Sequence, residues 1–307
     1  MMKELQSARL NKSLSKVPKW ADDRRPLSDD DLQSYIEGDP EVDAGLVCFE
    51  LFDYGMLAVS QSLLAAHDKR ATEANRLMSF GIKRMLYADM ITLKKVQVTR
   101  TGGFVGTLDG CTHLMLGAIA LGQPQLVAPF YQEVLDGVEG GYGAGDGHKP
   151  PVSSTLRYAA FGLSIISEWL GNPLDLDKHA LPRDPAWGQL VAHWREPAPE
   201  KLLPVLLAAC DVHIERMAVT DREASQDKKY EFSSTFLAVH PTEILAVLRL
   251  RDLLGLPNPT QIDHPLMQTP YAAITCRPGE VTENDELLDR YLAAMRQHDP
   301  HVLPPGL

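Results

Sequence analysis

The chain has 307 residues, 44% hydrophobic and 23% charged, a balance that is typical of a folded globular protein and excludes wholesale disorder. Its 30 basic and 41 acidic residues give a formal net charge of −11, so direct binding of nucleic acid is not expected, because phosphate contacts need clustered lysine and arginine. No run of about 18 apolar residues predicts a transmembrane helix, and the four cysteines lack metal-ligand spacing and disulfide density. We therefore expect a cytoplasmic protein with no membrane contact, no metal and no cofactor.

The N-terminal segments combine basic and acidic stretches. Residues 1–27 are basic and lack the apolar core of a signal peptide, and we expect them to form a mobile arm. A short helix is predicted from Ser28, a good N-cap, to Gly38, with acids in its first turn where the helix dipole favours them.

Two long helices are predicted next. Pro40 opens the first, an amphipathic helix of about seven turns, because proline is favoured in a first turn. Its apolar residues recur at spacings of three and four: Val42, Leu46, Phe49, Phe52, Met56, Val59, Leu63 and Ala66. The second runs from about Thr72 to Val98.

The rest of the chain alternates helices with turn-rich links. We expect helices over 108–121, 124–138, 152–170, 187–194, 199–219 and 236–256, a glycine-rich loop over 141–151, an exposed polar segment over 221–232, and a last helix capped by Thr282. Alternating strand patterns bounded by hairpin turns do not occur. The predicted fold is all-α, about ten antiparallel helices in a bundle or two-layer array without a significant sheet. Residues 28–140 form an N-terminal helical half and residues 152–307 a C-terminal half.

The sequence offers no motif for chemistry. The glycine-rich loop follows a helix, and Lys149 precedes proline, so a phosphate-binding loop is not indicated. His113, His213 and His240 each stand alone in a helical segment, where a core histidine with satisfied hydrogen bonds is the usual case. A GxSxG nucleophile motif is also missing from the chain. We therefore expect no catalytic residues and no enzyme.

Negative charge is concentrated near the N-terminus. Residues 22–53 hold 11 acidic residues against Arg24 and Arg25, a net charge of −9. Such a field attracts a basic partner and speeds encounter. A solvated helix face that keeps the protein soluble explains the same charges about as well.

One segment carries a family resemblance. HPTEILAVLRLRDLLGLPNPTQIDHPLMQTPYA (240–272) is similar to the C-terminal signature of helical immunity proteins that guard bacteria against polymorphic and type VI secretion nuclease toxins, of which the PoNi group is one example. FELFDYGMLAVSQSLLA (49–65) resembles their first long helix, and LDGCTHLMLGAIALGQPQLVAPF (108–130) resembles their helix–Gly–helix step. The TsiT-like proteins are a narrower match. The chain differs from the PoNi pattern in its glycine-rich loop and in its proline-rich residues 173–199.

The resemblance implies an immunity protein that neutralises a cognate toxin in the producing cell. The toxin would be a nuclease with a basic groove, which an acidic helical surface can cover. The candidate partner-binding residues are the acids Asp29, Asp30, Asp31, Glu37, Asp39, Asp43 and Glu50, with Tyr35 and Tyr54 as anchors. The signature residues Glu243, Arg249, Asp263, His264 and Pro265 are interpreted as structural: a glutamate in an apolar helix needs a hydrogen-bond partner, and an aspartate before a turn can supply a cap.

Two other classes of function stay open. An effector-binding adaptor or chaperone of a secretion system would bind its partner without inhibiting it. A metal-dependent helical enzyme would need a second acidic cluster, for which Glu283, Asp285 and Glu286 are the nearest candidates.

Overall fold

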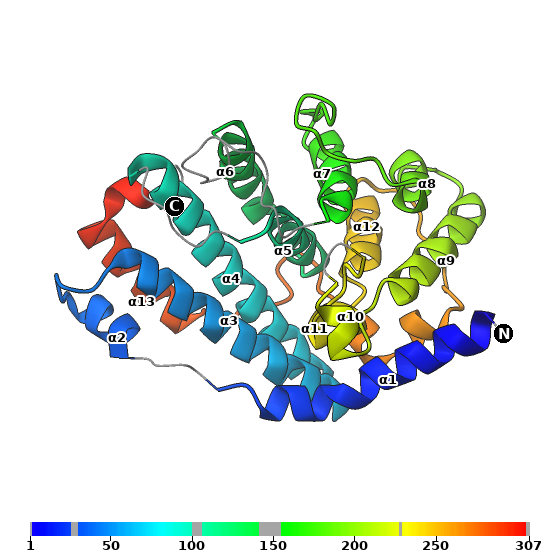
Figure 1. Ribbon diagram of the computed structural model, residues 1–307, viewed down its shortest axis with the longest axis horizontal. Helices are drawn as coiled ribbons and strands as arrows, with labels where there is room; N and C mark the ends of the chain where they lie inside the picture. The colour runs from blue at the N-terminus through cyan, green and yellow to red at the C-terminus, as the bar shows by residue number, and fades with distance from the viewer. Residues whose placement is uncertain (1, 26–29, 100–105, 141–154, 227–228, 305–307) are drawn as a thin grey trace.

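The computed structural model describes residues 2–25, 30–99, 106–140, 155–226 and 229–304, and over these residues the protein is all-α (Figure 1). The α-helices are α1 (Met2–Asp22), α2 (Asp30–Glu37), α3 (Ala44–His67), α4 (Ala71–Thr99), α5 (Leu108–Ala120), α6 (Val127–Glu139), α7 (Arg157–Trp169), α8 (Pro185–His193), α9 (Pro199–Glu215), α10 (Asp221–Ala224), α11 (Thr235–Val239), α12 (Thr242–Leu253) and α13 (Glu286–His298). Four short 3₁₀ helices join them: η1 (Pro124–Leu126), η2 (Pro265–Gln268), η3 (Pro270–Ala273) and η4 (Pro300–Val302). The described chain contains 13 α-helices and no strand, which confirms the predicted fold class.

The core is organised around α5. The long helices α3 and α4 pack along each other, and α5 packs against α4 on one side and against α7 and α12 on the other. Eleven of its residues, Leu108 and Cys111 to Ala120, are buried. One continuous hydrophobic cluster runs from α1 to α13, so the core extends across both predicted halves.

The helix α3 is, among the described residues, the one helix long and apolar enough to cross a membrane by length and composition. In this structure 56% of its most apolar 18-residue window is buried inside the protein. Core helices of globular proteins pass the same test.

The N-terminal segment is a packed helix, so the prediction of a mobile arm is wrong for residues 2–22. Leu10, Val17 and Ala21 are buried, because apolar side chains at these spacings form one stripe along the helix. Arg9 donates to the carbonyls of Ile214 and Met217 and pairs with Glu223 at 2.9 Å. The basic side chains of this segment lie beside the stripe and do not prevent its packing.

Three predicted helix boundaries are also wrong. The helix α3 begins after Asp43, whose carboxylate accepts from the Gly45 and Leu46 N–H groups, and not at Pro40. The predicted helix over 236–256 is two helices, because Pro241 cannot donate a backbone hydrogen bond and keeps His240 extended. The cap of α13 is Asp285, which accepts from the Leu288 N–H.

Candidate functional site

The predicted acidic residues divide into an exposed and a buried set. Asp30, Glu37 and Asp39 are exposed and Asp31 is partly exposed, while Asp29 lies outside the described residues. These four described acids lie on α2 and in the turn that follows it, so they stay candidates for contact with a partner.

Asp43 is exposed but already engaged. Its two carboxylate oxygens accept from Lys95 Nζ at 2.7 and 2.8 Å, in addition to capping α3. The Lys95 hydrogen bond is the main reason why its pKa lies below the usual range. Lys95 therefore already neutralises much of the negative charge that Asp43 could offer to a partner.

Glu50 and Tyr35 lie inside the protein, which corrects their assignment to the partner-binding surface. Glu50 is 5% exposed and accepts the N–H of Leu32, so it satisfies a backbone donor in the first turn of α2. Tyr35 is 2% exposed and donates to Asp299 Oδ2 at 2.8 Å. Helical periodicity alone did not show that α13 covers this side of α2.

Tyr54 is half-buried and packs against the hydrophobic core, so it is a boundary residue. The large apolar side chains that α3 does expose are Leu46, 48% exposed, and Phe49, 44% exposed. Their spacing places them in the apolar stripe of this helix, and the prediction that this stripe is buried is wrong for both residues.

The helix α13 brings further acids next to α2. The two helices pack together through Tyr35, Tyr291 and Met295, and Arg290 on α13 donates to Gln33 on α2. Glu286 and Asp289 are exposed. The exposed and partly exposed acids of these two helices and of the turn after α2 form the acidic surface: Asp30, Asp31, Glu37, Asp39, Glu41, Glu286 and Asp289.

Glu243 has the buried partner that its position required. Both Glu243 and His213 are 0% exposed, and His213 Nδ1 lies 2.7 Å from Glu243 Oε1. His213 Nε2 donates to the Ala238 carbonyl at 3.1 Å, so Nδ1 and the carboxyl group share one proton. The pair ties α9 to α12, as expected of a structural residue.

The other signature residues hold local structure. Arg249 is buried and pairs with Asp252 at 2.9 Å. The cap of η2 is His264, whose Nδ1 accepts from the Leu266 N–H, and not Asp263, which accepts from the Gln268 side chain. Pro265 is the first residue of η2. The cap therefore lies one residue later than predicted.

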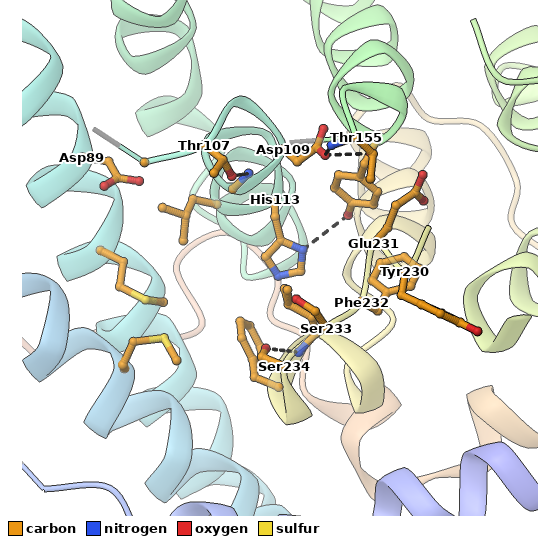
Figure 2. A pocket seen from close by; sticks show the side chains of 18 of the residues that line it. Asp89, Thr107, Asp109, His113, Thr155, Tyr230, Glu231, Phe232, Ser233 and Ser234 are labelled. Carbon is orange, nitrogen blue, oxygen red and sulfur yellow. Dashed lines mark hydrogen bonds between the residues drawn. The ribbon is translucent and has the colours of Figure 1, made fainter. Parts of the chain in front are cut away.

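A cavity of about 420 Å³, which no sequence pattern predicts, lies between α3, α4, α5 and the segment 230–237 (Figure 2). Its apolar lining includes Phe52, Met56, Met85, Leu114, Phe232, Phe236 and Leu237. Asp89 lies on one side, and Tyr230 and Glu231 lie on the opposite side. A second cavity, of about 480 Å³, shares Phe52, Met56 and Asp89 with the first.

His113, at the wall of the first cavity, belongs to a chain of hydrogen bonds. His240 Nε2 faces the Ile274 carbonyl at 3.0 Å and must donate to it. Its Nδ1 then accepts from Thr242, 2.7 Å away, and Thr242 in turn accepts from His113 Nε2 at 3.3 Å. His113 Nδ1 is left to accept from Tyr158 at 3.4 Å. Both histidines are neutral in this arrangement.

Burial supports the neutral state, since it lowers the pKa of His113 to about 3 and that of His240 to about 4. With both ring nitrogens engaged, His113 has no lone pair for proton abstraction. The histidines are core residues, as predicted, although His113 and His240 belong to one chain of hydrogen bonds and do not stand alone.

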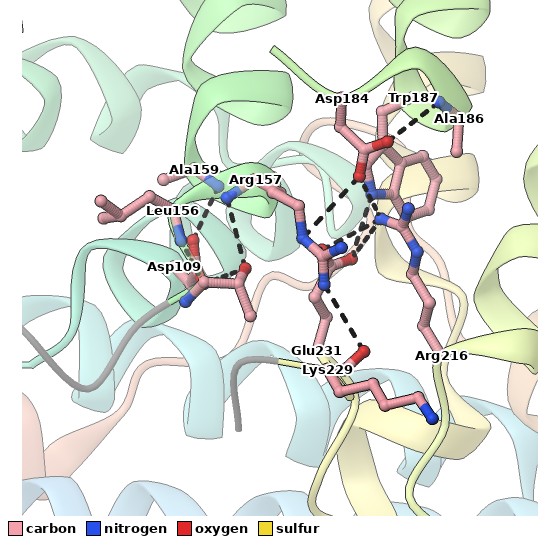
Figure 3. Close-up of polar contacts among 11 residues, drawn as sticks. Asp109, Leu156, Arg157, Ala159, Asp184, Ala186, Trp187, Arg216, Lys229 and Glu231 are labelled. Carbon is pink, nitrogen blue, oxygen red and sulfur yellow. Dashed lines mark hydrogen bonds and ion pairs between the residues drawn. The ribbon is translucent and has the colours of Figure 1, made fainter. Parts of the chain in front are cut away.

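Two other acids of the first cavity are fully engaged (Figure 3). Asp109 accepts from the N–H groups of Thr155, Leu156 and Ala159 and so caps the start of α7. The Glu231 side chain is 1% exposed and has three partners: Arg157 at 3.2 Å, Arg216 at 3.0 Å and the Trp187 ring N–H at 3.1 Å. Residues 221–232 are therefore not exposed throughout, because Glu231 and Phe232 point inward.

Asp89 differs from these acids. It is 7% exposed, and within the described chain its one hydrogen bond comes from the Cys111 thiol, with Sγ 3.8 Å from Oδ2. No lysine, arginine or histidine nitrogen of the described residues lies within 4.0 Å of it. Burial raises the pKa of Asp89 to about 7.

The geometry gives no support to a paired-acid metal centre. Asp285, nominated for a second acidic cluster, accepts from Arg84 through both oxygens, at 2.7 and 2.8 Å. Among the described residues no three histidine, cysteine, aspartate or glutamate side chains are grouped so that they could hold a metal ion.

No family model, no curated protein and no solved structure matches this chain.

Proposed function

We propose that the chain is an immunity protein that binds and neutralises a cognate secreted toxin, a type VI nuclease effector, through the acidic surface. One observation carries this proposal: Asp31, Glu37, Asp39, Glu286 and Asp289 have no ion-pair partner within the described residues. Their charges are therefore not neutralised by a direct ion pair and are available to a basic partner.

The acids of α2 and α13 project from neighbouring helix faces. At about 100° per residue, Asp30 and Glu37 lie opposite the buried Leu32 and Tyr35 on α2. Glu286 and Asp289 likewise lie opposite the buried side of α13. The two helices pack together at one end of the molecule, so their exposed acids lie at that same end (Figure 1).

A nuclease domain presents the complementary field. Its groove binds phosphates with clustered lysine and arginine, and opposite potentials steer association and raise its rate. An apolar contact is also needed, because charge pairs at a wet rim contribute little affinity. Leu46, exposed on the first turn of α3 close to Asp43, is our candidate for that contact.

The proposal is tested by purification from the native host. The tagged chain is isolated at moderate salt, its stoichiometric partner is identified by mass spectrometry, and the partner's nuclease activity is measured with and without the chain. We expect a basic nuclease domain whose activity is lost on binding. A bound partner that keeps full activity would favour the adaptor class, and a purified chain without any partner would contradict both.

A charge-reversed variant shows whether the acidic surface makes the contact. Glu37→Lys/Asp289→Lys should weaken capture of the partner at least tenfold. Glu200→Lys/Glu215→Lys is the matched control, since it changes the net charge equally at two exposed positions of α9, at the opposite end of the molecule (Figure 1). Equal losses in both variants would point to net charge and not to this surface.

A further inference from the structure

The first cavity has the size and lining of a site for a small organic molecule. Its volume of about 420 Å³ lies within the usual range for such sites, roughly 300–1,000 Å³. Aromatic, methionine and leucine side chains form most of its wall, and a few polar groups interrupt them. An apolar ligand that displaces water from this wall would bind favourably, because both apolar surfaces are removed from water.

Asp89 is the feature of this cavity that the fold does not explain. A buried carboxylate without a cation or a set of N–H donors is costly. Asp109 has backbone N–H donors and Glu231 has two arginines, whereas Asp89 has, among the residues that the structure describes, only a weak thiol donor at 3.8 Å. The helix α4 thus holds a poorly compensated acid at the wall of a mostly apolar space.

We propose that this cavity binds a small organic cation, a primary amine on an apolar body, with the ammonium group at Asp89. The ammonium supplies the positive charge and the hydrogen-bond donors that the carboxylate lacks. The apolar body packs against Phe52, Met56 and Phe236. This site is independent of the acidic surface on α2 and α13, and either assignment can fail without the other.

The chemistry of the wall excludes other ligand classes. An anion would meet the carboxylate of Asp89, which no lysine or arginine of the described residues neutralises through an ion pair. A metal ion would find no group of three suitable side chains in the described part of the chain. A neutral apolar molecule would fit the wall but leave Asp89 without a partner. The elevated pKa of Asp89 agrees with this conclusion, because burial raises it and no positive charge in the described part of the chain offsets that effect.

The proposal is tested by calorimetric titration of the full chain at about pH 8, where an acid with a pKa of about 7 is ionised. The probes are phenethylamine, tryptamine and octylamine, each beside the alcohol in which hydroxyl replaces the amine. We expect at least one amine to bind tenfold or more tightly than its alcohol. Absence of binding by all three amines, or equal affinity of every amine and its alcohol, would overturn the proposal.

Two variants test whether the amine binds at Asp89. Asp89→Asn should bring the ratio of amine to alcohol affinity to about one while the affinity for the alcohol changes less than twofold. Leu237→Trp, which fills the cavity from α11, should weaken amine and alcohol together. Asp136→Asn, at an exposed position of α6, is the control and should leave all affinities unchanged. A preference for the amine that survives in Asp89→Asn, or unchanged binding in Leu237→Trp, would contradict the assignment.

Discussion

Asp89→Asn should change how the stability of the protein depends on pH. Burial raises the pKa of this carboxyl from an ordinary value of 3.8 to about 7. The folded state therefore holds the proton more tightly than the unfolded state does. An acid of this kind contributes stability that is fully present below its unfolded pKa and is lost as the pH rises through its folded pKa.

The magnitude follows from the two pKa values. Each pKa unit corresponds to 1.36 kcal/mol, so the free energy of unfolding of the wild type falls by about 3 kcal/mol between about pH 5 and about pH 9 because of this one group. Asparagine does not titrate, so the free energy of unfolding of the variant does not fall with pH for this reason. Relative to wild type, the variant should therefore gain about 3 kcal/mol over the same interval.

Urea unfolding followed by circular dichroism at several pH values measures the effect. The opposing contribution of His113 and His240, whose pKa values burial lowers, is common to both proteins and cancels in the comparison. Asp136→Asn, the exposed control, should follow the wild-type profile. If the Asp89→Asn and wild-type profiles run parallel, the Asp89 carboxyl is not buried as the structure has it.

Three further substitutions test the packing. Glu243→Ala should cost roughly 3–5 kcal/mol of unfolding free energy, because it leaves His213 buried without its partner, and Glu243→Gln should cost less; chemical denaturation measures both. Arg251→Met should lower the free energy of unfolding by about 3 kcal/mol or more, since the buried guanidinium donates to the carbonyls of Trp194, Glu196 and Pro257. A decrease of less than about 1 kcal/mol in the same measurement would contradict this role. Val17→Asp should lower the free energy of unfolding by about 3 kcal/mol or more, because it buries an unpaired charge, whereas Lys12→Asp, at an exposed position, should lower it by less than about 1 kcal/mol. If the two variants melt at the same temperature, α1 is not packed against the core and the prediction of a mobile arm is correct.

Helical periodicity predicted the fold class and most helices, because the apolar spacing that buries one side of a helix is visible in the sequence. The boundaries of α3 and α13 were missed by a few residues, since Asp43 and Asp285 were not recognised as caps. The interpretation of α1 failed for another reason. Its many basic residues favour a solvated segment, whereas the stripe of Leu10, Val17 and Ala21 buries one side of the helix.

The sites were less accessible to prediction, because they depend on contacts between distant segments. Exposure of the acids on α2 could be predicted, but burial of Tyr35 results from α13, more than 250 residues further along the chain. The need of Glu243 for a partner could be predicted, whereas the identity of that partner, His213, could not. Asp89 lies in an apolar stretch of α4, but the sequence does not show which segments cover it, and in the structure Gly106 and Cys111 lie against its carboxyl group.

The most direct test of toxin binding through the acidic surface is the association rate of the chain with its purified partner, measured by stopped flow across a range of salt concentrations. We expect fast association that slows steeply with salt for the wild type and for Glu200→Lys/Glu215→Lys. For Glu37→Lys/Asp289→Lys we expect slow association with a flat salt dependence. Identical rates and salt dependence for all three proteins would contradict the proposal that α2 and α13 form the binding surface.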